Sequence, residues 1–204
     1  MDNKALYKIG YGLYVLSARE GDKDNACIVN TVMQVTSDPL RLVVAVNKAN
    51  YTNGMIARTG IFNVSVLSER ADLDVFKRFG FASGKDTDKF AGLDCRRGAD
   101  GALLYDAPCV NALFECRVVD KLDLASHTLF IAQPTEGVLL GDTPTCTYEY
   151  YQKHIKPAPA AVAKDKTVWR CKICGYEYEG DVLPEGFVCP ICKHPASDFE
   201  KVGG

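Results

Sequence analysis

Four cysteines crowd into the last 35 residues of the chain as two C-x-x-C pairs. Cys171 and Cys174 form the first pair, Cys189 and Cys192 form the second, and 14 residues separate the two pairs. Each pair makes a tight turn that directs two sulfurs at one point, and two facing turns form the tetrahedral sulfur site that suits iron or zinc. Two disulfides are the alternative, but they fit a reducing compartment poorly. The spacing therefore predicts one metal ion held by four thiolates.

The segment around these cysteines resembles rubredoxin. The matching features are Cys171-x-x-Cys174-Gly175-Tyr176-x-Tyr178, Pro184-x-Gly186-Phe187, Cys189-Pro190-x-Cys192 and Asp198-Phe199, with Trp169 completing an aromatic core against the metal. The gap between the pairs is shorter than in free-standing rubredoxins, and Lys193 replaces the glycine that is usual after the fourth cysteine. The resemblance implies one iron ion that passes one electron at a time. Zinc is the alternative metal.

The other cysteines are scattered, and the total of nine is odd, which fits a closed disulfide framework poorly. We expect Cys27, Cys95, Cys109, Cys116 and Cys146 to be free core thiols. No apolar run approaches the roughly 18 residues that cross a bilayer, and the first residues do not form a signal peptide. We therefore expect a cytoplasmic protein without a membrane partner.

A stretch without apolar periodicity divides the chain. Residues 152–167 hold two prolines two positions apart among alanines and lysines, a composition that favours extended backbone and buries little. Residues 1–150 carry 16 basic and 19 acidic groups, while residues 151–167 have a net charge of +3 and residues 168–204 of −2. The absence of a basic face argues against a nucleic-acid partner. We expect one domain over 1–151, a linker over 152–167 and a small metal domain over 168–204.

The first domain is expected to be mainly β-structure. Short runs rich in Val, Ile, Leu and Tyr recur between Gly, Asn, Asp and Pro, and only two helices interrupt them. The sequence contains neither a phosphate-binding P-loop nor a complete G-x-G-x-x-G fingerprint, because Val15 stands where the third glycine is needed. This pattern favours a closed or sandwiched antiparallel architecture. The expected strands are Gly12–Ala18, Ala26–Val35, Leu40–Asn47, Ile61–Leu67, Ala112–Val119, Thr128–Leu140 and Thr145–Tyr151, and the helices are Thr52–Thr59 and Ala71–Phe79.

Residues 5–152 resemble the flavin reductase family. The matching segments are 25–36, Pro39-Leu40, Asn47-x-x-Asn50-Tyr51-Thr52, 62–67, 83–90 and His127-Thr128-Leu129-Phe130. The resemblance implies an antiparallel split β-barrel that binds FMN. Combined with the rubredoxin-like segment, the chain resembles the high-molecular-weight rubredoxins of anaerobes, which pass electrons from NAD(P)H through FMN to iron and on to flavodiiron proteins.

The residue chemistry fits a flavin phosphate site at the start of the first helix. Asn47, Asn50 and Thr52 lie at the turn into this helix, where free N–H groups and the positive end of the dipole attract phosphate. Helix capping by Asn50 or Thr52 is the alternative, and both roles can coexist. The resemblance also implies flavin contacts from the loop at 83–89, for which a solvated surface loop is the alternative. It further implies contacts with the flavin ring, mainly through the backbone of 30–34. These residues are Ser83 and Lys89 in the loop, and Asn30, Thr31, Val32, Met33 and Gln34 along the ring.

His127 is the candidate catalytic residue among the three histidines. His154 lies in the expected linker and His194 lies beside the second cysteine pair. The resemblance implies that His127 faces the flavin and the nicotinamide, where an imidazole can donate a hydrogen bond to the substrate or stabilise reduced flavin. A structural histidine at the start of a strand is the alternative.

We therefore expect an NAD(P)H-dependent flavin/rubredoxin oxidoreductase with FMN and one iron ion per chain. An electron carrier of the flavoredoxin kind, reduced by another protein, is the alternative. A partner-binding protein with a zinc ribbon is a third reading. The residues do not distinguish NADH from NADPH, and FMN rather than FAD rests on the resemblance. Successive apolar positions such as Val138-Leu139-Leu140 also predict a homodimer.

Overall fold

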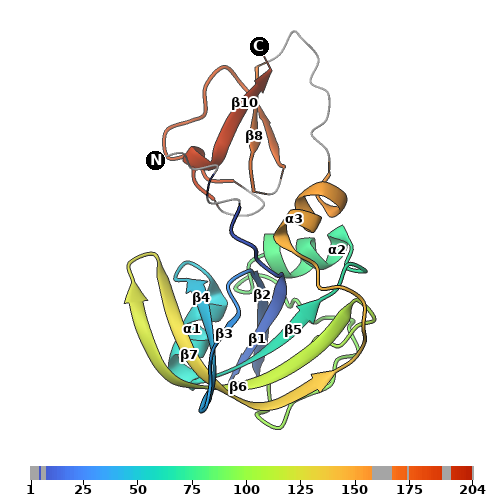
Figure 1. The fold of residues 1–204 in the computed structure, drawn as a ribbon. Helices are drawn as coiled ribbons and strands as arrows, with labels where there is room; N and C mark the ends of the chain where they lie inside the picture. Colours follow the sequence, from blue (N-terminus) through green and yellow to red (C-terminus); the bar gives the residue numbers. More distant parts are fainter. Residues whose placement is uncertain (1–4, 6–7, 158–166, 174, 190–193, 204) are drawn as a thin grey trace.

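The computed structural model describes residues 5, 8–157, 167–173, 175–189 and 194–203. Within them, seven antiparallel strands form one sheet in the order β2-β1-β5-β6-β7-β4-β3 (Figure 1). The sheet curls, because Cys27 near one edge and Val44 near the other pack into the same core. The strands are β1 (Tyr14–Glu20), β2 (Lys23–Val29), β3 (Met33–Ser37), β4 (Leu40–Asn47), β5 (Ile61–Leu67), β6 (Val110–Leu124) and β7 (His127–Leu139).

Helix α1 (Tyr51–Thr59) follows β4 and packs against β1 and β2. Its start is defined by the N-cap Asn50, whose side chain accepts from the Thr52 N–H. Its end is defined by Gly60, which adopts a left-handed φ of 70° and returns its N–H to the Ile56 carbonyl. A left-handed residue of this kind is the usual helix stop, because glycine pays no Cβ penalty there. The helix therefore starts one residue before the predicted Thr52–Thr59.

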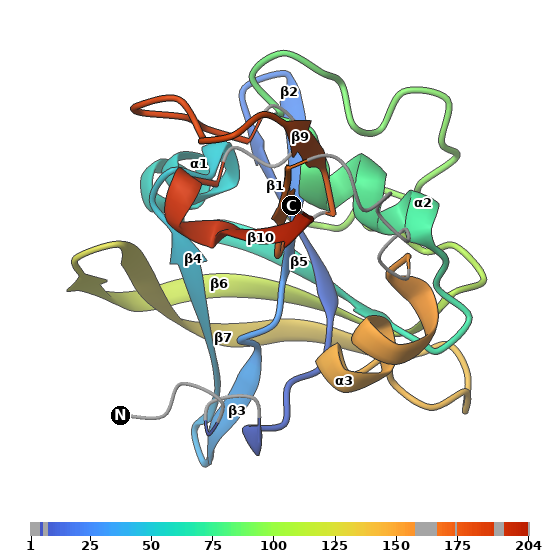
Figure 2. The same cartoon turned by 90° about the horizontal axis from the view of Figure 1, so that it is seen from above.

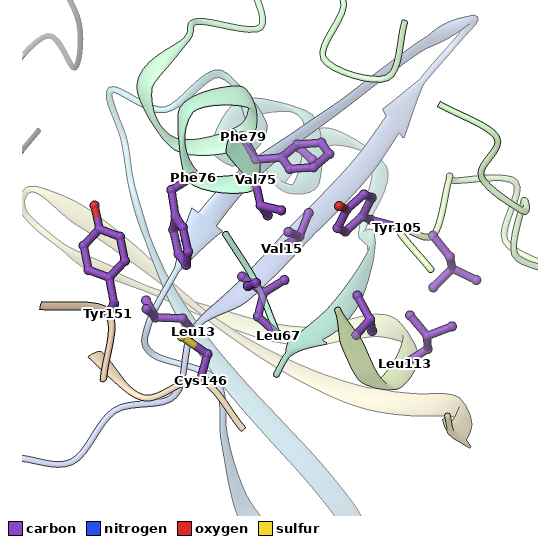
Figure 3. Close-up of a cluster of buried hydrophobic side chains, with 14 of the residues drawn as sticks. Leu13, Val15, Leu67, Val75, Phe76, Phe79, Tyr105, Leu113, Cys146 and Tyr151 are labelled. Atoms are coloured by element: carbon purple, nitrogen blue, oxygen red, sulfur yellow. The ribbon is translucent and has the colours of Figure 1, made fainter. Parts of the chain in front are cut away.

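A second core lies under the remaining helices, α2 (Leu73–Phe76) with the π-helix η2 (Lys77–Phe81), and α3 (Tyr148–Tyr150) with the π-helix η3 (Tyr151–Ile155). Figure 3 shows aromatic side chains from these segments meeting over β1 and β5. The ring centroids of Phe76 and Tyr151 are 4.4 Å apart, and those of Phe79 and Tyr105 are 4.9 Å apart. Because Phe76 and Tyr151 are 3% and 6% exposed, these contacts fix both helical segments to the barrel.

Most expected strands are confirmed, and two expectations are wrong. Ala26–Val35 is not one strand but parts of β2 and β3, which lie at opposite edges of the sheet. Thr145–Tyr151 is not a strand, because Thr147 caps α3 by accepting from the Tyr150 N–H and the following tyrosines pack on the second core. Residues 152–155, which were expected at the start of the linker, belong to η3.

The C-terminal segment forms a small sheet of its own. Strand β8 (Val168–Cys171) lies between β10 (Phe199–Gly203) and β9 (Glu177–Glu179), and η4 (Ala196–Asp198) precedes β10. We call residues 167–203 the C-terminal module. Figure 2 views it from above the barrel. In neither part do the described residues include a helix long and apolar enough to span a membrane.

Candidate functional site

The two C-x-x-C segments bring their described cysteines into one buried place. Cys171 and Cys189 are each 0% exposed and share a hydrophobic cluster with Phe199. The Gly175 N–H donates to the Cys171 carbonyl at 2.9 Å, and the Cys189 N–H donates to the His194 carbonyl at 2.8 Å. The first bond joins the ends of the stretch from Cys171 to Gly175, and the second joins Cys189 to His194. The other predicted ligands, Cys174 and Cys192, lie outside the described residues.

Partly buried aromatic side chains pack beside these cysteines. The Phe187 ring lies 5.3 Å from that of Phe199 and 5.0 Å from that of Tyr178, centroid to centroid. Trp169 donates its indole N–H to the Gly180 carbonyl at 3.1 Å, so the ring packs without an unpaired donor. The described residues contain no cluster of three or more metal-ligating side chains, because only two of the four predicted ligands fall among them. Thiolates in an apolar shell are the donors that iron and zinc prefer.

The second predicted site lies where β4 ends and α1 begins. Asn50 Oδ1 accepts from the Thr52 N–H at 3.3 Å, and Asn47 Oδ1 accepts from the Ala49 N–H at 2.9 Å. Asn50 is therefore a helix cap, as the capping alternative predicted. Phosphate binding at this N-terminus stays a prediction, and the cap is compatible with it.

Asn25 connects this helix to the polar loop at residues 83–89. Asn25 is 1% exposed and donates from Nδ2 to Thr52 Oγ1 at 2.9 Å, while its Oδ1 has no partner in the structure. Gly84 approaches so closely that an added Cβ would lie 2.0 Å from this Oδ1. Gly84, the neighbour of Ser83, therefore lies near the start of α1, and contact of Ser83 with the flavin stays a prediction. A buried acceptor without a partner fits a ligand hydroxyl, such as those of a ribityl chain.

The segment expected along the flavin ring leaves the sheet at Thr31. Thr31 Oγ1 donates to the Ala45 carbonyl at 2.8 Å and accepts from the Ala45 N–H at 3.1 Å, replacing the ladder partners that β3 would supply there. In the described chain, the backbone of 30–32 makes no hydrogen bond to other backbone. Contact of this backbone with the flavin ring stays a prediction. Met33 and Gln34, which follow in β3, are exposed.

His127 lies at the start of β7, directly opposite Asn47 of β4. Opposite residues in an antiparallel pair project to the same face, so the register brings the predicted catalytic residue beside the helix start. Ser126 Oγ lies 2.9 Å from His127 Nδ1, which orients the ring. His127 and the start of α1, which are far apart in sequence, therefore adjoin in the fold.

Lys89 is buried, so the alternative of a solvated loop does not hold for this residue. It is 3% exposed, and its Nζ donates to the Ala26 carbonyl at 2.8 Å and to the Phe79 carbonyl at 2.9 Å. Ala26 belongs to the edge strand β2, so the lysine fastens η2 to an open edge of the sheet. Burial lowers the pKa of Lys89 below its ordinary value, although the nearby Cys27 opposes this shift. Its contact with the flavin remains a prediction.

Sequence reasoning missed Asn25 and Cys27 as members of this site. Asn25 and Cys27 are two positions apart in β2, so both side chains face α1. This two-residue period was the available signal that they share one face of the strand. Burial raises the pKa of the Cys27 thiol, while Thr52 and Lys89 oppose the shift. The thiol is therefore protonated at neutral pH and acts as a small buried group rather than as a nucleophile.

Two family models match the chain. The model described as flavin reductase like domain matches residues 6–159, and the model described as rubrerythrin, rubredoxin-like domain matches residues 169–200. Together they cover both predicted sites. The first model implies a flavin and the second implies iron.

Curated relatives include one that matches over its whole length. The chain is 35% identical to a high molecular weight rubredoxin of Moorella thermoacetica over 99% of this chain and 100% of the relative. It is 36% identical to a ferric-chelate reductase (NAD(P)H) of Archaeoglobus fulgidus over 74% of this chain and 89% of the relative. Among solved structures, it is similar to BorF, the flavin reductase component of a bacterial two-component tryptophan halogenase. That match has 24% identity and a TM-score of 0.62, covers 72% of this chain and 93% of the other, and shows the fold alone.

Proposed function

This chain belongs to the flavin reductase-like family, and from that premise we propose that it is an oxidoreductase that passes electrons from NAD(P)H through FMN to iron. The iron is held by Cys171, Cys174, Cys189 and Cys192. The final acceptor is a redox protein, for which a flavodiiron protein is our specific candidate. One observation carries the proposal: a single chain combines the flavin reductase-like barrel with a buried pair of cysteines in rubredoxin-like turns.

Two cofactors explain why the two parts share a chain. A bound flavin exchanges electrons with a hydride donor in pairs and with a one-electron centre singly, so it converts one kind of transfer into the other. The barrel's own residues bind and orient it. The helix start at Asn50 and the unpartnered Asn25 Oδ1 hold the polar tail, and the backbone of 30–32 faces the ring. His127 lies at the same end and is our candidate for the nicotinamide contact.

The visible absorption spectrum of the purified protein tests the proposal first. We expect flavin bands together with the absorption of a four-thiolate ferric site, and a colourless protein would refute the redox function. Steady-state oxidation of NADH and NADPH with an artificial acceptor then tests the donor. If neither nucleotide reduces the flavin while dithionite does, the protein is an electron carrier reduced by another protein.

We also propose a homodimer, supported by apolar side chains that the single chain leaves uncovered. The apolar run Val138-Leu139-Leu140 includes Leu139, which is 74% exposed. Further exposed apolar residues lie on the β3–β4 and β6–β7 hairpins, whose strands β4 and β7 pair directly. They are Met33, Val35, Leu40, Val119, Leu122 and Leu124. A symmetric partner is the simplest cover for such a surface.

Light scattering tests the assembly. We expect a mass near twice 22.3 kDa for the wild type and half of that for Leu122→Lys, which places a charge in the proposed contact. Lys121→Glu is a control, because this neighbouring side chain contacts the Ala57 carbonyl of its own chain. A monomeric wild type at micromolar concentration would refute the dimer.

We further propose a cytoplasmic location, consistent with free thiols at Cys27 and the four other scattered cysteines.

A further inference from the structure

A lysine at the end of the barrel domain reaches the metal-binding turn of the C-terminal module. Lys156 Nζ donates to the backbone carbonyl of Lys172. Lys172 lies between the two cysteines of the first C-x-x-C pair, directly after Cys171. The two parts are close at this point in Figure 1, where α3 and η3 end beneath the module. The contact therefore joins the barrel to the turn that would hold the iron.

The barrel holds the base of this lysine firmly. The Lys156 N–H donates to the Tyr151 carbonyl at 2.8 Å, which closes the last turn of η3. Tyr151 is 6% exposed and packs against Phe76 with its ring tilted, and Ile155 packs against the same core. The backbone that carries the ammonium group thus belongs to the folded barrel and not to the chain that leads away from it.

The charges on the two sides of the contact are complementary. Lys156 supplies a positive charge on the barrel side, and residues 168–204 carry a net charge of −2 before any metal is counted. A ferric ion with four thiolates is already anionic, and reduction adds one further negative charge without a proton. A nearby ammonium group attracts the reduced form more than the oxidised form, because the interaction scales with the product of the charges.

We propose that Lys156 is a positioning residue that docks the iron module on the barrel and favours reduction of the iron while it is docked. The inference rests on the proposed function, because it needs iron at the four cysteines. Linkage makes the effect reciprocal: if docking favours the reduced iron, then reduction strengthens docking by the same factor. The module is therefore held best just after it has received an electron.

Redox titration of the iron absorption in the full-length holoprotein tests this proposal. Lys156→Gln removes the charge, and we expect the equilibrium constant for iron reduction to fall roughly threefold to tenfold, or about 30–60 mV at 59 mV per tenfold for one electron. Lys156→Arg keeps a cationic donor and should retain the wild-type potential. Lys153→Gln is the matched control, because Lys153 lies on the same turn but pairs with Glu149 at 2.6 Å.

Salt provides a second readout. Raising the ionic strength screens exposed charges, so the wild-type potential should approach that of Lys156→Gln, which should itself change less. An unchanged potential in Lys156→Gln would overturn the proposal. An equal shift in Lys153→Gln would also overturn it, because the effect would then reflect net charge and not this contact. A protein without the ferric absorption would instead refute the iron site of the proposed function, on which the role of Lys156 depends.

Discussion

Replacing Lys89 by methionine should damage the fold more than it damages flavin binding. Methionine keeps the length of the buried side chain but removes the donor, which leaves the Ala26 and Phe79 carbonyls without the partners at 2.8 and 2.9 Å. A buried acceptor deprived of its partner costs about 1–3 kcal/mol, so two acceptors cost about 2–6 kcal/mol. Methionine relieves the burial of an ammonium group, which places the expected loss in the lower half of that range.

Urea unfolding of the flavin-free protein measures this loss directly, and titration with FMN measures the affinity of the folded variant. Lys85→Met is the matched control, because Lys85 lies on the same loop and is exposed. We expect the control to unfold like the wild type. Unchanged stability of Lys89→Met together with a large loss of FMN affinity would refute the reasoning and return Lys89 to direct phosphate contact.

Three further predictions follow from the described contacts. Burial lowers the pKa of Lys89, so between that lowered pKa and about 10.4 the unfolded chain binds more protons at this residue than the folded chain does. The free energy of unfolding of the wild type, relative to that of Lys89→Met, should therefore rise from pH 7 to about pH 9.5. A difference that falls with pH would contradict this. Cys171→Ser should lose iron, measured by metal analysis, and keep its flavin; loss of both would show that the parts do not fold separately. Thr31→Val leaves both Ala45 groups unpaired and should cost about 1–3 kcal/mol in urea unfolding, whereas Thr31→Ser should retain most of the stability.

The sequence predicted the strands whose apolar pattern and turn residues agree. Leu40–Asn47 and Ile61–Leu67 are bounded by turn-forming residues and match β4 and β5. The pattern could not show that Ala26–Val35 divides, because the break depends on the Thr31 hydroxyl binding Ala45 of a different strand. Helix formation at Tyr148–Ile155 was equally hidden, since tyrosines favour strands locally and the packing of Tyr151 on Phe76, which favours the helix, is a long-range contact.

The candidate sites were also predictable to different degrees, because some depend on local sequence spacing and others on contacts between distant segments. The cysteine spacing is local, and the fold brings the described Cys171 and Cys189 into one buried cluster, while their role as metal ligands stays a prediction. Lys89 was placed by its neighbours in a polar loop, and sequence alone does not show that its side chain turns inward to the carbonyls of β2 and η2. Asn25 was overlooked because its importance lies in an oxygen without a partner, which only the assembled fold reveals.

The position of η3 also sets the kinetic order of electron transfer between the two proposed redox centres. The helix fixes the chain to the barrel up to Lys156, so only residues 157–166 separate that anchor from Thr167 at the start of the module. The eleven steps from Lys156 to Thr167 span at most about 40 Å even when fully extended. A module confined within such a radius has an effective concentration in the millimolar range at its own barrel. Internal electron transfer is then a first-order event whose rate does not depend on how much protein is present, and an outside acceptor must compete with that local supply.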